Sequence, residues 1–327
     1  MLAVLASFLH SSIVQGIPLL FGATGEILTE KSGHLNLGIP GIMYVGGISG
    51  IVGGYLYEHF CERPVALLCI LIPLVCSLLG SGLMALIYCF LTVTLRANQN
   101  VTGLALTTFG TGIGNFLGGS LLSFFGESGS ISLLTIGKWY KAYPAFADKL
   151  GVFGEIFCSY GFLAYLAVIV ALLVHYFLNK TRAGLNLRSV GENPATADAA
   201  GINVTRYKYW STVIGGMIAG LGGLYFVMDY TGGTWTNNGF GDRGWLAIAI
   251  VIFALWKPAR AIWCSFVFGG LYICAVLIPG LSSAAKEVIK MAPYIVTIVV
   301  LVLSSVHNRR ENQPPASLGL NYFREDR

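Results

Sequence analysis

The sequence predicts an all-α protein that crosses a membrane many times. Of its 327 residues, 55% are hydrophobic and only 11% are charged, and the mean hydropathy is +0.71. A soluble domain carries roughly 25% charged residues, so this chain lacks the polar surface that contact with water requires. The 42 glycines show no three-residue period, and small residues let helices approach closely in lipid. The net charge of +5 does not indicate nucleic-acid binding.

Apolar stretches near the ~20 residues that span a bilayer recur along the chain. We predict about nine transmembrane helices (eight to ten) in a membrane domain of residues 1–306, followed by a flexible cytoplasmic tail, 307–327. The predicted helices are residues 3–27, 34–57, 65–91, 100–125, 155–178, 207–228, 244–256, 261–279 and 292–306. The seventh is too short for a straight span, so it combines with the glycine-rich run before it or stops partway.

The basic residues predict the orientation, because loops rich in Lys and Arg stay in the cytoplasm. The loop 179–206 and the start of the tail are the most basic connections, so both are predicted to be cytoplasmic. Alternation along the nine helices then places residues 126–153 and the N-terminus outside.

An irregular backbone is predicted near residues 28–41. Glu26, Glu30, Asn36, Pro40 and several glycines lie here between two apolar runs. At membrane depth, irregular backbone is tolerated only where it is buried in protein or lines a watery cavity. We therefore expect a broken or re-entrant segment beside a translocation path. An ordinary cytoplasmic loop before a capped second helix is the alternative.

The fourth predicted helix has one polar face beside a strip of glycines. Unpaired polar groups inside a bilayer cost several kcal/mol, so this face should meet other helices or a pathway. The candidate pathway residues, including the Asn of the irregular segment, are Asn36, Asn100, Thr107, Thr111 and Asn115. Hydrogen bonding between helices, without any substrate, explains each of them equally well.

The loop 179–206 contains the sequence signal of a short helix. Asn193 can cap a helix that has Pro194 at its first position, and Gly201 can end the Ala-rich run that follows. A short helix on the cytoplasmic side fits a groove on a soluble partner, although it could also be a plain surface connection. The candidate coupling residues are Gly191, Glu192, Asn193, Pro194, Ala197 and Gly201.

Motifs for catalysis and metal binding are missing from the sequence. It has no P-loop, no Gly-x-Ser-x-Gly and no His-Glu-x-x-His, and its seven cysteines form no Cys-x-x-Cys pair. We therefore assign no catalytic residue, metal ligand or cofactor to this chain. We also identify no intramembrane Asp, Glu or His relay, which argues against an ion-driven carrier.

Three motifs resemble one transporter group. Residues 30–43 read Glu-Lys-Ser-Gly-His-Leu-Asn-Leu-Gly-Ile-Pro-Gly-Ile-Met, which is similar to the Glu-Arg-Ser-Gly-x-x-Asn-Ile-Gly-x-Glu-Gly-Met signature of permeases in the branched-chain amino acid, simple sugar and nucleoside ABC importers. Residues 184–203 resemble the cytoplasmic coupling segment of that group, and residues 256–258 resemble its Gly-Lys-Trp-x-Pro turn. The sequences of the coupling loop and of residues 96–99 are most similar to those of bacterial nucleoside permeases. Pro40 departs from the pattern where a Glu is common, so no role of that carboxylate is transferred.

The resemblance implies a complex in the bacterial cytoplasmic (inner) membrane. It would contain a second permease, often a non-identical paralogue, two cytoplasmic ATPase subunits that bind ATP and Mg, and an extracytoplasmic substrate-binding protein. ATP-driven closure would move the segment 184–203 and switch the cavity between outward and inward access.

Two other functions stay open. A branched-chain amino acid or simple-sugar permease of the same group would share these motifs. A stand-alone carrier or a membrane-embedded enzyme would need no ATPase partner, so purification without one would favour it.

Overall fold

A computed structural model describes residues 2–126, 129–144, 147–277, 282–306 and 313–323. Within these residues the regular structure is helical, apart from one isolated antiparallel bridge between Ser132 and Thr234. The all-α prediction is therefore confirmed. The longer helices are α1 (Leu2–Glu30), α2 (Ile39–Phe60), α3 (Ala66–Cys89), α4 (Gln99–Phe124), α7 (Phe162–Lys180), α10 (Val204–Tyr225), α11 (Arg243–Phe253), α12 (Pro258–Leu277) and α14 (Ala292–Val306). The shorter helices are α5 (Leu134–Lys141), α6 (Gly151–Phe157), α8 (Arg182–Glu192), α9 (Pro194–Ala199) and α13 (Ser283–Lys290).

Each of the nine predicted stretches overlaps one of the longer helices, and the stretch 155–178 also includes the end of α6. Among the described residues, five helices are long and apolar enough to cross a membrane: α1, α2, α3, α7 and α10. Helices α11 and α12 are shorter apolar helices over their described residues. With 11 residues, α11 stops partway, because at ~1.5 Å per residue it is much shorter than a bilayer core. The chain is thus a multi-pass membrane protein.

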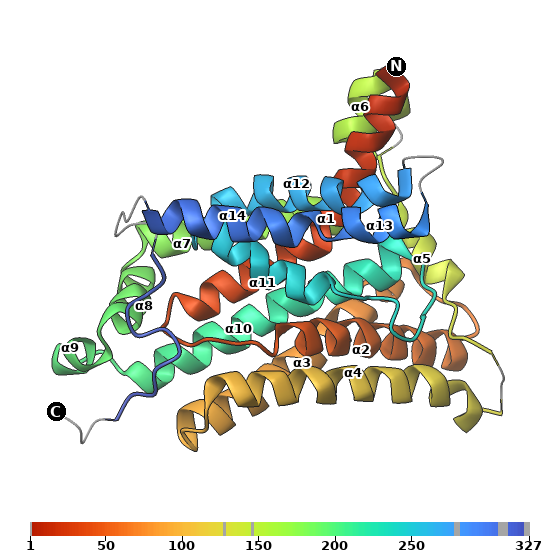
Figure 1. Ribbon diagram of the computed structural model, residues 1–327. Helices are drawn as coiled ribbons and strands as arrows, with labels where there is room; N and C mark the ends of the chain where they lie inside the picture. Colours follow the sequence, from red (N-terminus) through yellow and green to blue (C-terminus); the bar gives the residue numbers. More distant parts are fainter. Residues whose placement is uncertain (1, 127–128, 145–146, 278–281, 307–312, 324–327) are drawn as a thin grey trace.

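Helices α1, α2 and α10 form the centre of the bundle, and glycines make their close packing possible. A Cβ atom on Gly46 of α2 would lie 2.5 Å from the backbone of Gly220 on α10. A Cβ on Gly25 of α1 would lie 2.2 Å from the carbonyl oxygen of Gly215, also on α10. The backbones therefore touch directly, which is how small residues replace the hydrophobic drive between helices in lipid. Helices α3 and α4 cover this centre on one side, and α12 and α14 cover it on the other (Figure 1).

The connections gather at two opposite ends of the bundle (Figure 1). One end holds α8, α9, the chain between α1 and α2, and the described tail residues 313–323. The other end holds α5, α6 and α13. The segments that we predicted to be cytoplasmic thus share one end.

The local boundaries differ from the predictions at several points. Helix α1 continues to Glu30, and α2 begins only at Ile39, so the break between them covers residues 31–38. Two π-helical turns, Phe90–Thr94 and Phe226–Tyr230, end α3 and α10. Single-turn π segments have no signature in hydrophobic periodicity, and they are often found at functional sites.

Cysteine labelling can test which side of the membrane each end of the bundle faces. We expect Ala199→Cys, in exposed α9, to react with a membrane-impermeant maleimide only in inverted vesicles, and Ser130→Cys to react only from outside intact cells. Both variants should be made in a background whose native cysteines are replaced by alanine, because Cys61, Cys158 and Cys274 are partly exposed. Labelling of both positions from the same side would contradict the orientation.

Candidate functional site

The break between α1 and α2 is a compact, buried turn. Gly33 has a φ of 78°, a left-handed conformation that favours glycine. The side-chain oxygen of Asn36 accepts the backbone N–H of Gly38 at 2.9 Å, and the backbone N–H of Asn36 donates to Glu26 Oε1 at 3.0 Å. Asn36 is fully buried, and its side-chain nitrogen Nδ2 has no hydrogen-bond partner among the described residues. The predicted break is confirmed, while the pathway role of Asn36 stays a prediction.

Two carboxylates of α1 lie buried beside this turn. Glu26 is 0% exposed and Glu30 is 3% exposed, one helical turn apart. Trp256 Nε1 donates a hydrogen bond to Glu30 Oε2, whereas Glu26 Oε2 has no partner among the described residues. Leu255 and Trp256 both have a φ of 54°, a strained conformation for non-glycine residues. The turn at 256–258 and the segment at 30–43, two of the three sequence motifs, therefore meet at one point.

His34 is the third buried ionisable group of the region. Its two ring nitrogens bond to Thr212 Oγ1 and Thr92 Oγ1, each at 2.8 Å. Burial, together with the nearby charge of Lys208, lowers the pKa of His34 to about 3. The imidazole is therefore neutral, and it ties the irregular segment to α10 and to the π-helical turn after α3.

The polar face of α4 contacts the irregular segment through Thr107. Thr107 Oγ1 donates to the carbonyl oxygen of Leu37 at 2.8 Å. Within the described residues, Thr111 Oγ1 bonds only to the Thr107 carbonyl of its own helix, at 2.9 Å, and Asn100 is exposed. The glycine strip packs on α2, since a Cβ on Gly110 would lie 2.6 Å from the Gly41 carbonyl oxygen. The two sides predicted for this helix are therefore present.

Asn115 lies two turns further along α4, in a separate network. Its Oδ1 accepts the hydroxyl of Tyr44 at 2.5 Å, and its Nδ2 donates to Asn238 Oδ1 at 2.9 Å. The backbone N–H of Asn238 bonds to the Tyr44 hydroxyl at 2.8 Å. Asn238 has a φ of 57° and belongs to the connection between α10 and α11. The predicted pathway residues thus form two groups along α4 instead of one cluster.

The short helix predicted in loop 179–206 is present as α9. Asn193 Oδ1 accepts the backbone N–H of Thr196 at 3.0 Å, and Pro194 occupies the first turn. Gly201, with a φ of 82°, follows the helix end. Ala197 is buried against Val190 and Val204. The start of the helix differs from the prediction in one respect, because Gly191 and Glu192 end the preceding helix α8 and do not begin α9.

Helix α8 was not predicted, although its signal is in the sequence. Thr181 caps it by accepting the N–H of Gly184 at 3.0 Å, but its glycines lower its helix propensity. Its end packs directly on the break after α1, since a Cβ on Gly191 would lie 2.3 Å from the Lys31 carbonyl oxygen. The coupling segment and the irregular segment are therefore in backbone contact.

The described part of the tail joins these same segments. Ser317 donates its backbone N–H (3.0 Å) and its hydroxyl (2.6 Å) to the Gly191 carbonyl oxygen. Tyr322 donates its hydroxyl to Asp198 of α9 at 2.9 Å, and Asn321 Nδ2 donates to the Arg96 carbonyl at 2.8 Å. Residues 313–323 thus have defined contacts, which differs from the flexible end that we expected. The rest of the tail, 307–312 and 324–327, lies outside the described residues.

These features belong to a known transport family. The family described as "Branched-chain amino acid transport system / permease component" matches residues 8–303, which is most of the chain. The chain therefore belongs to this family of multi-pass membrane transport components.

Relatives of stated function fall in two substrate classes. The nucleoside ABC transporter permease protein NupC of Lactococcus lactis is 34% identical over 89% of this chain and 90% of its own length. The guanosine ABC transporter permease protein NupQ of Bacillus subtilis is 29% identical over 91% of this chain and 92% of its own length. A putative glucose ABC transporter permease of Haloferax volcanii, TsgC13, is 28% identical over 98% of both chains.

Second permeases of the same two bacteria are less similar. NupB of Lactococcus lactis is 24% identical over 42% of this chain and 37% of its own length, and NupP of Bacillus subtilis is 22% identical over 91% and 81%. In both species the nucleoside or guanosine permeases thus occur as two different chains.

Proposed function

We propose that this chain is the membrane-spanning permease subunit of an ATP-driven importer for nucleosides. The observation that carries the proposal is the direct contact of the coupling segment with the break between α1 and α2, at Gly191 and Lys31. A movement imposed on α9 from the cytoplasm would reach the bundle centre through this contact, without a flexible linker. The names of the two nucleoside and guanosine relatives supply the substrate class.

The proposed partners are based on the missing P-loop and on the apolar side chains that α3 and α4 expose. It has no P-loop, so ATP and Mg would bind to separate cytoplasmic subunits, with α9 in a cleft of the ATPase. The outer faces of α3 and α4 expose large apolar side chains such as Leu79, Leu83, Phe109 and Phe116. These faces suit lipid and a second, non-identical permease, as the paired relatives suggest. An extracytoplasmic binding protein in a bacterial cytoplasmic membrane would deliver the substrate.

The mechanism we propose is alternating access driven at one end. ATP binding would close the two ATPase subunits and displace α9 and α8 as a unit, because Ala197, Val190 and Val204 pack together. The displacement would act on residues 31–38 and, through the bond between Thr107 and Leu37, on α4. Two packed arrangements of these elements, each favoured by a different nucleotide state, would switch the bundle between outward and inward access.

A substrate competition experiment tests the function. We expect cells that express the whole importer to take up radiolabelled guanosine or adenosine, and we expect cells without this chain to lose that uptake. A tenfold excess of unlabelled nucleosides should compete, whereas glucose and leucine should not. The relative TsgC13 makes a sugar the second candidate, so competition by glucose alone would replace the nucleoside assignment.

A further inference from the structure

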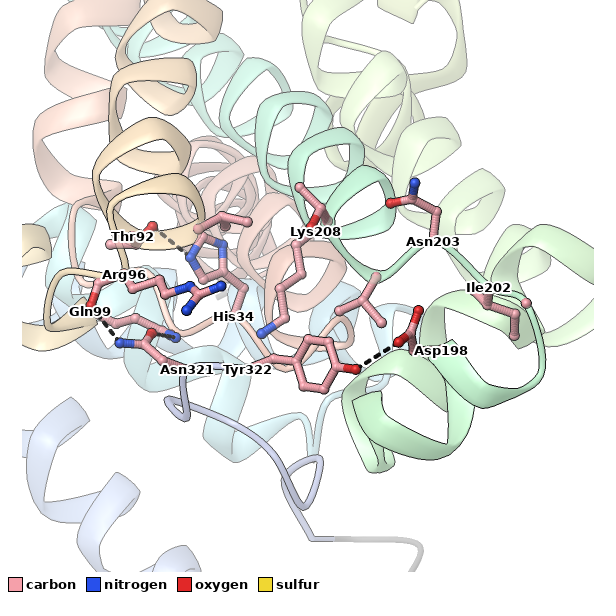
Figure 2. A pocket seen from close by; sticks show the side chains of 14 residues that line it. His34, Thr92, Arg96, Gln99, Asp198, Ile202, Asn203, Lys208, Asn321 and Tyr322 are labelled. Atoms are coloured by element: carbon pink, nitrogen blue, oxygen red, sulfur yellow. Dashed lines mark hydrogen bonds between the residues drawn. The ribbon is translucent and has the colours of Figure 1, made fainter. Parts of the chain in front are cut away.

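A polar cavity lies at the coupling end of the bundle, and none of the roles above uses it. Its volume is about 470 Å³, which is within the range of small-ligand sites, about 300–1,000 Å³. The start of α10, the bend after α3, α9 and the tail enclose it (Figure 2). The lining side chains on which its chemistry depends are His34, Arg96, Asp198, Lys208, Asn321 and Tyr322.

Lys208 is the main reason to expect a ligand. The residue is only 3% exposed, and its ammonium group points into the cavity (Figure 2). No carboxylate among the described residues pairs with it. A buried charge without a partner costs several kcal/mol, so such a group is expected to meet an anion that the chain itself does not provide.

The N-terminal end of α10 adds a second attraction for an anion. This helix begins at Val204, and Asn203 caps it by accepting the N–H of Arg206 at 2.9 Å. The first N–H groups of a helix have no partner within the helix and carry its positive dipole end. Val204 and Thr205 bring this end to the cavity wall.

Arg96 supplies a second cation in a strained position. Its φ of 58° lies in the left-handed region, which costs a non-glycine residue about 1 kcal/mol or more. Its guanidinium lies 4.7 Å over the ring of Phe323, and its carbonyl accepts the amide of Asn321. The tail therefore holds this arginine at the cavity.

The remaining charges do not neutralise the two cations. Asp198 is the one carboxylate among the described lining residues, and its Oδ2 accepts the hydroxyl of Tyr322. His34 is neutral, as described above. The cavity wall therefore carries an excess of positive charge.

We propose that this cavity binds a phosphate group between Lys208, Arg96 and the start of α10, with the tail residues Asn321 and Tyr322 closing it. A tetrahedral dianion matches two cations and several N–H donors better than a single carboxylate does. The phosphate can belong to a soluble monoester or to the headgroup of an acidic phospholipid. Because the ligand would touch the start of α10 and the tail, and Tyr322 of the tail bonds to Asp198 of α9, its binding would stabilise the coupling segment in the arrangement described here.

The test measures thermal unfolding of the full-length protein with its partner subunits in phosphatidylcholine nanodiscs. Inorganic phosphate or AMP, added at constant ionic strength, should raise the unfolding midpoint in a saturable way. Lys208→Met keeps the length of the side chain and removes the charge, and it should raise the half-saturating concentration at least about tenfold. Lys180→Met, which removes an exposed charge from the end of α7, should respond like the wild type.

The ligand-free midpoint separates binding from a structural role. Without phosphate, Lys208→Met should unfold at the wild-type temperature or above it, since an unpaired buried charge has been removed. A lower midpoint would show that Lys208 holds the structure together and would overturn the proposal. An equal response of wild type and Lys208→Met to phosphate would overturn it as well.

Two further arms identify the source of the phosphate. If a lipid headgroup occupies the cavity, phosphatidylglycerol in the nanodisc should raise the midpoint of the wild type but not that of Lys208→Met. If neither soluble phosphate nor phosphatidylglycerol raises the wild-type midpoint, the proposal is wrong.

The chain end carries two carboxylates, Glu325 and Asp326, so the double variant Glu325→Gln, Asp326→Asn is needed as well. A phosphate response that appears only in this variant would mean that the chain supplies its own anion, which also contradicts the proposal.

Discussion

Ala197→Pro is expected to abolish ATP-coupled uptake while the importer still assembles. The backbone N–H of Ala197 donates to the carbonyl of Asn193 at 3.0 Å, in the first bond that closes α9. Proline removes this donor and clashes with the preceding turn, at a cost of about 3 kcal/mol in a helix interior. The six-residue helix α9 has no second turn to compensate, so it should lose its shape. Uptake should fall at least about tenfold, as measured with radiolabelled nucleoside in proteoliposomes.

A second variant tests the same route from α8. Gly191→Ala would place a Cβ 2.3 Å from the Lys31 carbonyl oxygen, so α8 and the break after α1 must separate. Gly112→Ala is the matched control, because a Cβ at Gly112 of α4 meets nothing within 4 Å. Both coupling variants should copurify with the ATPase and retain basal ATP hydrolysis, but hydrolysis should no longer respond to the loaded binding protein. Wild-type uptake in both would show that α8 and α9 are not the coupling element.

The fold was predictable because membrane helices leave long apolar stretches in the sequence. All nine stretches are helices, since in lipid every backbone group must be bonded within its own segment. Local capping chemistry was also sufficient at α9, where Asn193 and Pro194 act as their residue types predict. Helix α8 was missed, because its cap at Thr181 lies beside glycines that favour a loop.

The site was less predictable, because it depends on contacts between distant segments. The sequence gives no sign that Trp256 donates to Glu30, or that Ser317 of the tail bonds to Gly191. The absence of an intramembrane Asp, Glu or His relay, which we used against an ion-driven carrier, is not supported, because Glu26 and Glu30 are both buried in α1. These glutamates lie at the end of an apolar run, where periodicity cannot separate a loop from the last turn of a helix. The case against such a carrier now depends on the family alone.

Asn115→Leu is expected to impair transport strongly at the opposite end of the bundle. Asn115 joins α2 to the connection between α10 and α11, through Tyr44 and Asn238. Leucine removes both bonds, so the buried Tyr44 hydroxyl loses its acceptor and Asn238 Oδ1 loses its donor. A buried polar group left without a partner costs roughly 1–3 kcal/mol. The connection should therefore lose its fixed position relative to α4. Uptake should fall about tenfold, while the amount of protein in the membrane changes less than about twofold.

Thr108→Leu is the matched control for this variant. Thr108 lies on the same helix, is exposed, and bonds only to the Leu104 carbonyl of its own turn. It should therefore retain uptake and expression. If Asn115→Leu loses folded protein and transport in equal proportion, the network only holds helices together, as interhelical hydrogen bonds do. If folded protein persists without transport, the side chain acts on the pathway. Asn115→Asp, which keeps the acceptor of the Tyr44 hydroxyl but loses the donor to Asn238, would then show which of the two bonds transport requires.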